Sequence, residues 1–104
     1  MKLCPAVFVV FVFCTSTGSA SSRAQRDRGA AVFSASGCAH CHSIRGSGGH
    51  KGPDLSGIGR RMKTSSMRTQ IVDGGKLMPP FGEDLQSAEI KDLLAYLHSC
   101  KAKK

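Results

Sequence analysis

The sequence contains few of the residues that build a large hydrophobic core. Its 104 residues include no tryptophan, one tyrosine and five phenylalanines, and twelve of them are glycine. A small domain buries only about 60% of the surface that its unfolded chain exposes, and each glycine adds chain entropy that folding must overcome. The chain is therefore short of core, and a large apolar group bound inside the fold would supply the missing packing.

The cysteines lack the companions that several common architectures need. A structural zinc site would require a second ligand pair beyond Cys38 and Cys41, but the chain after them offers only Cys100 with His50 and His98 scattered. A disulfide framework wants an even set of cysteines, and three of the five lie after residue 20. A thioredoxin-like dithiol would sit near a βαβ pattern, and the flanking segments do not alternate as strands do.

What the sequence does contain is a pair of thiols followed directly by an imidazole. Cys38 and Cys41 are three positions apart, and His42 comes next. This is the c-type haem attachment pattern. Two thiols on one short turn can each form a thioether to a vinyl group of one porphyrin, and the histidine is then held beneath the iron as the proximal ligand. We therefore predict one covalently attached haem c, with its iron, at these three residues.

The first 20 residues have the pattern of a signal peptide. A positive Lys2 precedes an apolar run of residues 3–14, and the small residues after it suit cleavage after Ala20 or Ala24. The apolar run is short for a membrane span, which needs about 20 residues. We expect a periplasmic or secreted protein in which residues 21–26 are a flexible lead-in and residues 27–104 form the domain.

Three helices are expected in that domain, with loop between the first two. The first is predicted at about residues 27–36 with Gly37 as its stop, the second at about 65–73, capped by Thr64 or Ser65, and the last from a cap at Ser87. An apolar stripe marks the last helix, at Ile90, Leu93, Leu94 and Leu97. In the first helix, Gly29 is either a poor helix residue or a flat spot where another helix approaches, on the face of Phe33.

The glycine-rich segment 43–59 contains Pro53, eleven residues after His42. A haem-binding histidine usually donates its other ring N–H to a carbonyl, and proline keeps its carbonyl while its fixed φ would hold that acceptor still. An ordinary turn proline is the alternative. Beside the haem motif we favour a hydrogen bond from His42 to the carbonyl of Pro53.

Met78 is the methionine best placed to bind iron. It precedes Pro79 and Pro80, which stiffen the segment and push it out of helical geometry. A thioether on such a loop could cross to the face of the haem opposite His42. The alternative is a methionine packed in the core, and Met62 and Met67 fit that description better. We therefore predict His42 and Met78 as the two iron ligands.

Together these segments resemble the class I mono-haem c-type cytochromes of bacteria over roughly residues 27–101. The resemblance implies an all-α fold of about three main helices wrapped around one covalently attached haem, with the last helix crossing the first near Gly29 and Phe33. It also implies the carbonyl of Pro53 as the partner of the proximal imidazole. Many members carry a tryptophan near the haem propionates, which this chain lacks. Arg60 and Arg61 are candidates for that contact, or they are simply exposed.

The function that these observations predict is electron transfer by a soluble periplasmic carrier, and not enzymatic turnover. If His42 and Met78 fill both axial positions, no iron site is left for a small-molecule substrate. Two alternatives stay open. One is a cytochrome subunit of a larger dehydrogenase or oxidase complex, and the other is a haem sensor or peroxidase with an open iron site.

The net charge of the chain predicts the sign of the charge on the surfaces of its partners. The formal net charge is +8, and +7 once Lys2 leaves with the signal peptide, so a basic surface can steer the protein to acidic redox partners. No aromatic residues interleave with the charges, and we expect no nucleic acid and contact with membranes only through partner complexes. His98 is expected at the surface, and Cys100 is either free or bridges two chains.

Overall fold

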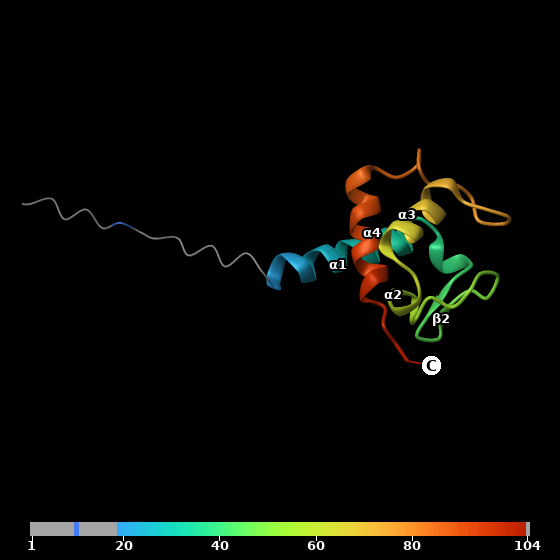
Figure 1. Cartoon of the computed structure of the whole chain (residues 1–104), viewed down its shortest axis with the longest axis horizontal. Coiled ribbons are helices and arrows are strands. Elements are labelled where there is room, and N and C mark those ends of the chain that lie inside the picture. Colours follow the sequence, from blue (N-terminus) through green and yellow to red (C-terminus); the bar gives the residue numbers. More distant parts are fainter. Residues whose placement is uncertain (1–9, 11–18, 104) are drawn as a thin grey trace, which may run out of the picture.

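The computed structural model describes residues 10 and 19–103, and residues 19–103 fold into helices joined by turns and loops (Figure 1). The helices are α1 (Ser19–Ala35), α2 (Ile58–Arg61), α3 (Thr64–Asp73) and α4 (Ser87–Ser99). Between α1 and α2 lie a 3-10 turn, η1 (Cys38–His40), and two strands, β1 (Ser43–Ile44) and β2 (Ser47–Gly48). Most of the predicted signal peptide, residues 1–9 and 11–18, lies outside the described residues.

The fold is mostly helical, but the small sheet means that the all-α prediction is not exact. Ser43 pairs with Gly48 and Ile44 with Ser47 in antiparallel register. Arg45 and Gly46 join the strands with φ angles of 52° and 79°, the left-handed values of a two-residue type I′ hairpin loop. Strands of two residues are too short to show an alternating pattern, and arginine rarely marks a left-handed turn, so this segment was expected to be loop.

Helix α1 begins at Ser19 and not at Asp27, so residues 21–26 are helical and are not the flexible lead-in that was predicted. Their polar composition suggested a frayed end. Arginine, alanine and glutamine are nevertheless good helix formers, and these turns continue directly into the part of α1 that packs on α4. The helix ends at Ala35, and Gly37 follows it with a left-handed φ of 81°.

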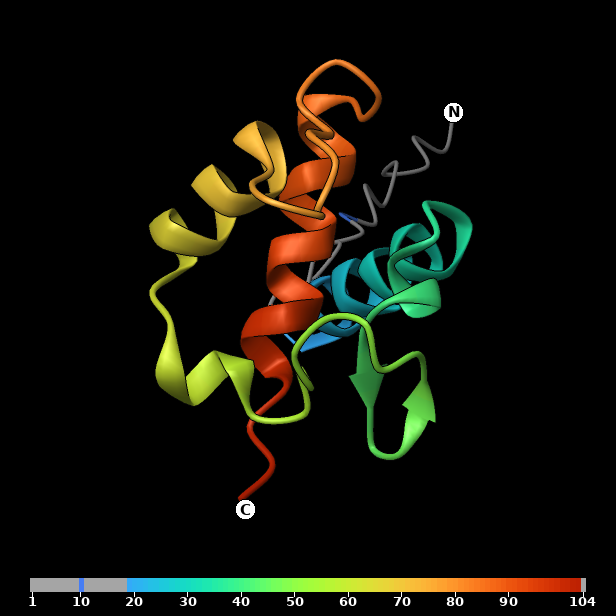
Figure 2. The ribbon, with the colours of Figure 1, turned by 90° about the vertical axis from the view of Figure 1, so that its right-hand side faces the viewer.

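Helices α1 and α4 cross in close contact, as Figure 2 shows. A Cβ on Gly29 would overlap the carbonyl oxygen of Asp92 and lie 2.7 Å from Cβ of Tyr96. On one side of this point Arg28 Nε donates to Asp92 Oδ2 over 3.1 Å. On the other side the rings of Phe33 and Tyr96 meet edge to face, with centroids 5.8 Å apart. The crossing predicted near Gly29 is therefore present, and glycine is there because the two backbones touch.

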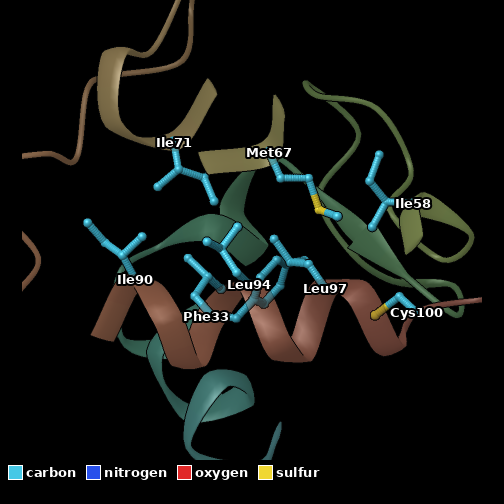
Figure 3. Packing of buried hydrophobic residues seen from close by; sticks show 9 residues of the cluster. Phe33, Ile58, Met67, Ile71, Ile90, Leu94, Leu97 and Cys100 are labelled. Atoms are coloured by element: carbon cyan, nitrogen blue, oxygen red, sulfur yellow. The ribbon is translucent and has the colours of Figure 1, made fainter. Parts of the chain in front are cut away.

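The hydrophobic core lies between α4, α3 and the end of α1 (Figure 3). The predicted stripe of α4 is buried, and Leu93 is 1% exposed. Met67 of α3 is buried as predicted, whereas Met62 is 38% exposed because it lies just beyond the short α2 and not on a packed face. The buried apolar residues are Phe33, Ile58, Met67, Ile71, Ile90, Leu93, Leu94, Leu97 and Cys100.

The starts of α3 and α4 differ in detail from the predicted caps. Lys63 is the N-cap of α3 and makes no side-chain cap bond. Gln86, and not Ser87, is the N-cap of α4. It forms a capping box in which the backbone N–H of Gln86 donates to Glu89 Oε1 over 3.1 Å. A glutamine cap is uncommon, so the serine next to it was the natural choice from the sequence.

The two ionisable residues at the end of α4 lie in different surroundings. His98 is exposed, as predicted. Cys100 is a free thiol that is only 7% exposed, and its Sγ lies 3.4 Å from the carbonyl oxygen of Tyr96. Burial raises the pKa of this thiol, and the nearby charge of Arg45 acts in the opposite direction. A buried thiol cannot reach a second chain, so the structure favours the free form of Cys100.

We expect Gly29→Ala to lower the free energy of unfolding by about 2 kcal/mol, since overpacking costs about 1–3 kcal/mol and a backbone carbonyl cannot rotate away. Urea unfolding of the haem-loaded protein measures this. Ser34→Ala, an exposed position on the same helix, is the control and should change stability by less than about 0.5 kcal/mol. Equal stability of Gly29→Ala and wild type would mean that the crossing is looser than the structure shows.

We expect Cys100 to react with iodoacetamide at pH 8 at least about tenfold more slowly in the folded than in the unfolded protein.

The raised pKa of Cys100 also has a consequence for stability, because the neutral thiol is favoured in the folded state. Its contribution is complete below about pH 8.5, the ordinary thiol pKa, and is lost as the pH rises through the higher folded value. Between pH 8 and 10, wild type should therefore lose more stability than Cys100→Ala.

Candidate functional site

The thiols of Cys38 and Cys41 lie on one tight turn that starts where α1 ends. The left-handed Gly37 redirects the chain into η1. The amides of Cys41 and His42 both donate to the carbonyl of Cys38, over 3.2 and 2.9 Å. Both thiols are free and half-buried. The turn therefore presents two cysteines and a histidine from five consecutive residues, which is the local geometry that the motif requires.

The pKa of the Cys38 thiol is shifted by its surroundings. Burial raises the pKa of the Cys38 thiol, which outweighs the lowering effect of a backbone hydrogen bond, and the neighbouring Cys41 raises it further. The reactive cysteine of a thioredoxin-like C-x-x-C motif has a lowered pKa. The pKa of Cys38 is therefore shifted in the direction opposite to that of a reactive dithiol cysteine.

His42 is oriented by a single hydrogen bond to the loop that follows the hairpin. Its Nδ1 lies 2.9 Å from the carbonyl oxygen of Pro53. A carbonyl can only accept, so Nδ1 carries the proton and Nε2 is the nitrogen that can bind a metal. The bond that the sequence predicted between these residues is present.

Gly52 makes room for the imidazole ring. A Cβ at this position would lie 2.7 Å from Cε1 and 2.9 Å from Nδ1 of His42. Every other residue would therefore push the ring away from the carbonyl of Pro53. The sequence showed Gly52 as one of six glycines in this segment, and only its position directly before Pro53 could have singled it out.

Met78 lies in the segment between α3 and α4, in a tight turn. Its amide and carbonyl exchange hydrogen bonds with those of Gly75, at 2.8 and 3.0 Å, around a turn in which Lys76 has a left-handed φ of 46°. The side chain is half-buried and packs against the same hydrophobic cluster as Cys38. Gln70 Nε2 lies 3.7 Å from Met78 Sδ. The sequence missed Gln70, because it stands among exposed polar residues of α3.

The two arginines considered for the propionates both bind backbone. Arg60 Nε donates to the carbonyl of Lys101 over 2.8 Å, and Arg61 Nη2 donates to the carbonyl of Asp54 over 2.9 Å. Arg60 thus fixes the segment after α4, and Arg61 fixes the loop that carries Pro53. These contacts give both residues a structural role next to the site.

The donor set suits haem c. The structure offers two free thiols on one turn, an imidazole whose Nε2 is left for the iron, and a half-buried thioether from a separate loop. Within residues 10 and 19–103, no three side chains of His, Cys, Asp or Glu come together to hold a metal ion, as the four ligands of a structural zinc site would.

Comparison with known families favours haem c over a dithiol oxidoreductase or a structural zinc site. Residues 24–97, most of the chain, match the model of the family described as cytochrome c oxidase, cbb3-type, subunit III. The chain belongs to this family of c-type cytochromes. No curated protein and no solved structure matched it. Membership implies haem-based electron transfer and a covalently bound haem c with iron. The matched segment of this cytochrome contains the cysteine motif, Pro53 and Met78.

Proposed function

We propose that this cytochrome carries one electron at a time between redox proteins, on a single haem c. Cys38 and Cys41 would form the two thioethers, and His42 and Met78 would bind the iron. The hydrogen bond between His42 Nδ1 and Pro53 carries the proposal, because it fixes the imidazole with Nε2 free to bind iron.

Each residue has a distinct part in this function. The bound iron would supply a reversible one-electron couple, and methionine as its second protein ligand would raise the potential. If His42 and Met78 both bind the iron, no iron position would be left for a substrate, and the protein would act as a carrier and not as an enzyme. Gln70, beside the sulfur of Met78, helps to hold that side chain in one orientation.

The site of action is proposed to be the periplasm, on the evidence of the amino-terminal sequence. Lys2 and the apolar run after it have the pattern of a signal peptide. Among the described residues, none of the helices has the length and apolar character needed to span a bilayer. Cleavage after Ala20 would leave nearly all of α1 in place, whereas cleavage after Ala24 would remove its first six residues.

A second candidate is a subunit of a larger respiratory complex. The family description, subunit III of a cbb3-type cytochrome c oxidase, favours it. Purification from the source organism in mild detergent separates the two possibilities. A free carrier elutes at the size of one chain, of about 11.0 kDa before processing, whereas a subunit co-elutes with large membrane proteins.

Partners are proposed to be redox proteins with acidic docking surfaces. Fifteen basic residues outnumber seven acidic ones, and such a surplus accelerates encounter with acidic surfaces at low salt. Leu77, next to the proposed ligand Met78, is 92% exposed. Lys76 precedes it in the same turn and is also exposed. An apolar tip beside a cation is suited to a short-lived contact close to the haem.

We expect the ferric wild-type protein, made in a host with cytochrome c maturation, to be low-spin with a sulfur–iron charge-transfer band. Met78→Ala should abolish that band. Met62→Ala, at an exposed methionine beyond α2, is the control and should keep it. Visible spectra before and after dithionite measure both. A high-spin ferric form that Met78→Ala leaves unchanged would instead indicate an open iron site and a sensor or peroxidase.

We expect Leu77→Ser to slow oxidation of the reduced protein by membranes of the source organism about five- to tenfold, since a buried apolar anchor at an interface is worth about 1 kcal/mol or more. Spectrum and reduction potential should not change. Met62→Ser, at another exposed large apolar residue, is the control. An unchanged rate for Leu77→Ser across low and high salt would place the docking surface elsewhere.

A further inference from the structure

The hydrogen bond between His42 and Pro53 is one of four that join two segments side by side. The segment 41–45 carries the histidine, and the segment 52–56 carries the proline. The first two bonds run from Gly52 N–H to the carbonyl of Cys41 (2.7 Å) and from His42 Nδ1 to the carbonyl of Pro53 (2.9 Å). The next two run from Leu55 N–H to the carbonyl of Ser43 (2.8 Å) and from Arg45 N–H to Ser56 Oγ (2.7 Å). The two segments therefore run in the same direction and hold each other in register.

The last of these bonds differs from the others because a side-chain hydroxyl makes it on the proline segment. Ser56 Oγ accepts from Arg45 N–H and donates to Asp54 Oδ1 over 2.6 Å. Asp54 Oδ1 also accepts the backbone N–H of Ser56 over 2.8 Å. The hydroxyl thus ties the hairpin turn to the residue that directly follows Pro53.

The turn that Ser56 holds is one that its sequence does not favour. Arg45 has a left-handed φ of 52°, a conformation that brings the Cβ of a residue with a side chain too close to the following carbonyl oxygen. The hydrogen bond from its N–H to Ser56 offsets part of the cost of this conformation. The carbonyl of Ser56 in turn accepts from Ala102 N–H over 3.0 Å, so the same residue anchors the proline segment to the chain after α4.

We propose that Ser56 is a positioning residue for His42. Through Asp54 and the register of the two segments, its hydroxyl keeps the carbonyl of Pro53 at hydrogen-bonding distance from Nδ1. This inference rests on the proposed function, in which His42 binds the iron. A ring N–H that donates to a carbonyl makes the imidazole a more basic ligand. A more basic ligand favours the ferric state, so loss of the hydroxyl should raise the reduction potential.

Haem-loaded Ser56→Ala tests the proposal with two readouts. In the ferrous protein, NMR should show the Nδ1 proton of His42 exchanging with solvent about tenfold faster than in wild type, because local opening exposes it more often. The equilibrium constant for reduction should rise about threefold, which is about 28 mV at 59 mV per tenfold for one electron.

Three further variants make the result specific. Ser56→Thr keeps a hydroxyl and should restore both readouts. Asp54→Asn leaves Ser56 in place but weakens the acceptor of its hydroxyl. It should shift both readouts in the same direction as Ser56→Ala, by a smaller amount. This variant also tests the proposal if Ser56→Ala does not fold. Ser47→Ala removes an exposed hydroxyl from strand β2 of the same hairpin and should change neither.

The outcomes separate this inference from the proposed function. If wild type is low-spin with methionine ligation, and Ser56→Ala lowers stability without changing proton exchange or potential, then Ser56 has only a structural role and the inference fails. If wild-type His42 does not bind iron at all, its Nδ1 proton shows no haem-shifted resonance, and the proposed function fails first.

Discussion

The hydrogen bond from His42 Nδ1 to the carbonyl of Pro53 is the contact on which the arrangement of the site depends. Nothing in the turn η1 itself fixes the imidazole ring, because the bonds there hold only backbone. The carbonyl selects the tautomer and the direction of Nε2. It can do so because Gly52 clears space beside the ring and because proline holds its own φ fixed. Gly52, which has no side chain, and Pro53, which has a fixed φ, thus together orient the imidazole of His42.

The wider fold supports this contact through a second close approach of backbones. Gly29 lets α1 and α4 touch at the carbonyl of Asp92, and the turn that carries Cys38 follows soon after the end of α1. The core beneath it contains one buried aromatic side chain among the described residues, that of Phe33. With so little aromatic packing, the position of the turn rests on the α1–α4 contact and on the stripe of α4. Cys38 and Met78 both pack against this core, and a covalently held haem would add apolar surface to it.

Much of this could be predicted from the sequence because the signals are local. The spacing of Cys38, Cys41 and His42, the stripe of α4 and the stop at Gly37 are each visible within one or two helical turns. The hairpin and the start of α1 were missed for physical reasons. Arg45 is left-handed in a two-residue hairpin loop, and the Ser56 hydroxyl that accepts its N–H lies eleven residues away along the chain. The polar start of α1 shows no amphipathic pattern and is helical because its residues have good propensity.

The two proposed iron ligands are held by different means, and this difference follows from chain connectivity. His42 sits in a segment that is linked to residues 52–56 by four hydrogen bonds, so its surroundings form from one short stretch of chain. Met78 depends on the turn closed by Gly75 and on the packing of α3 and α4, which brings distant segments together. Loop closure makes such long-range contacts costlier to form. The surroundings of His42 therefore form from contacts that are local in the chain. Those of Met78 form only when the helices of the domain have packed together.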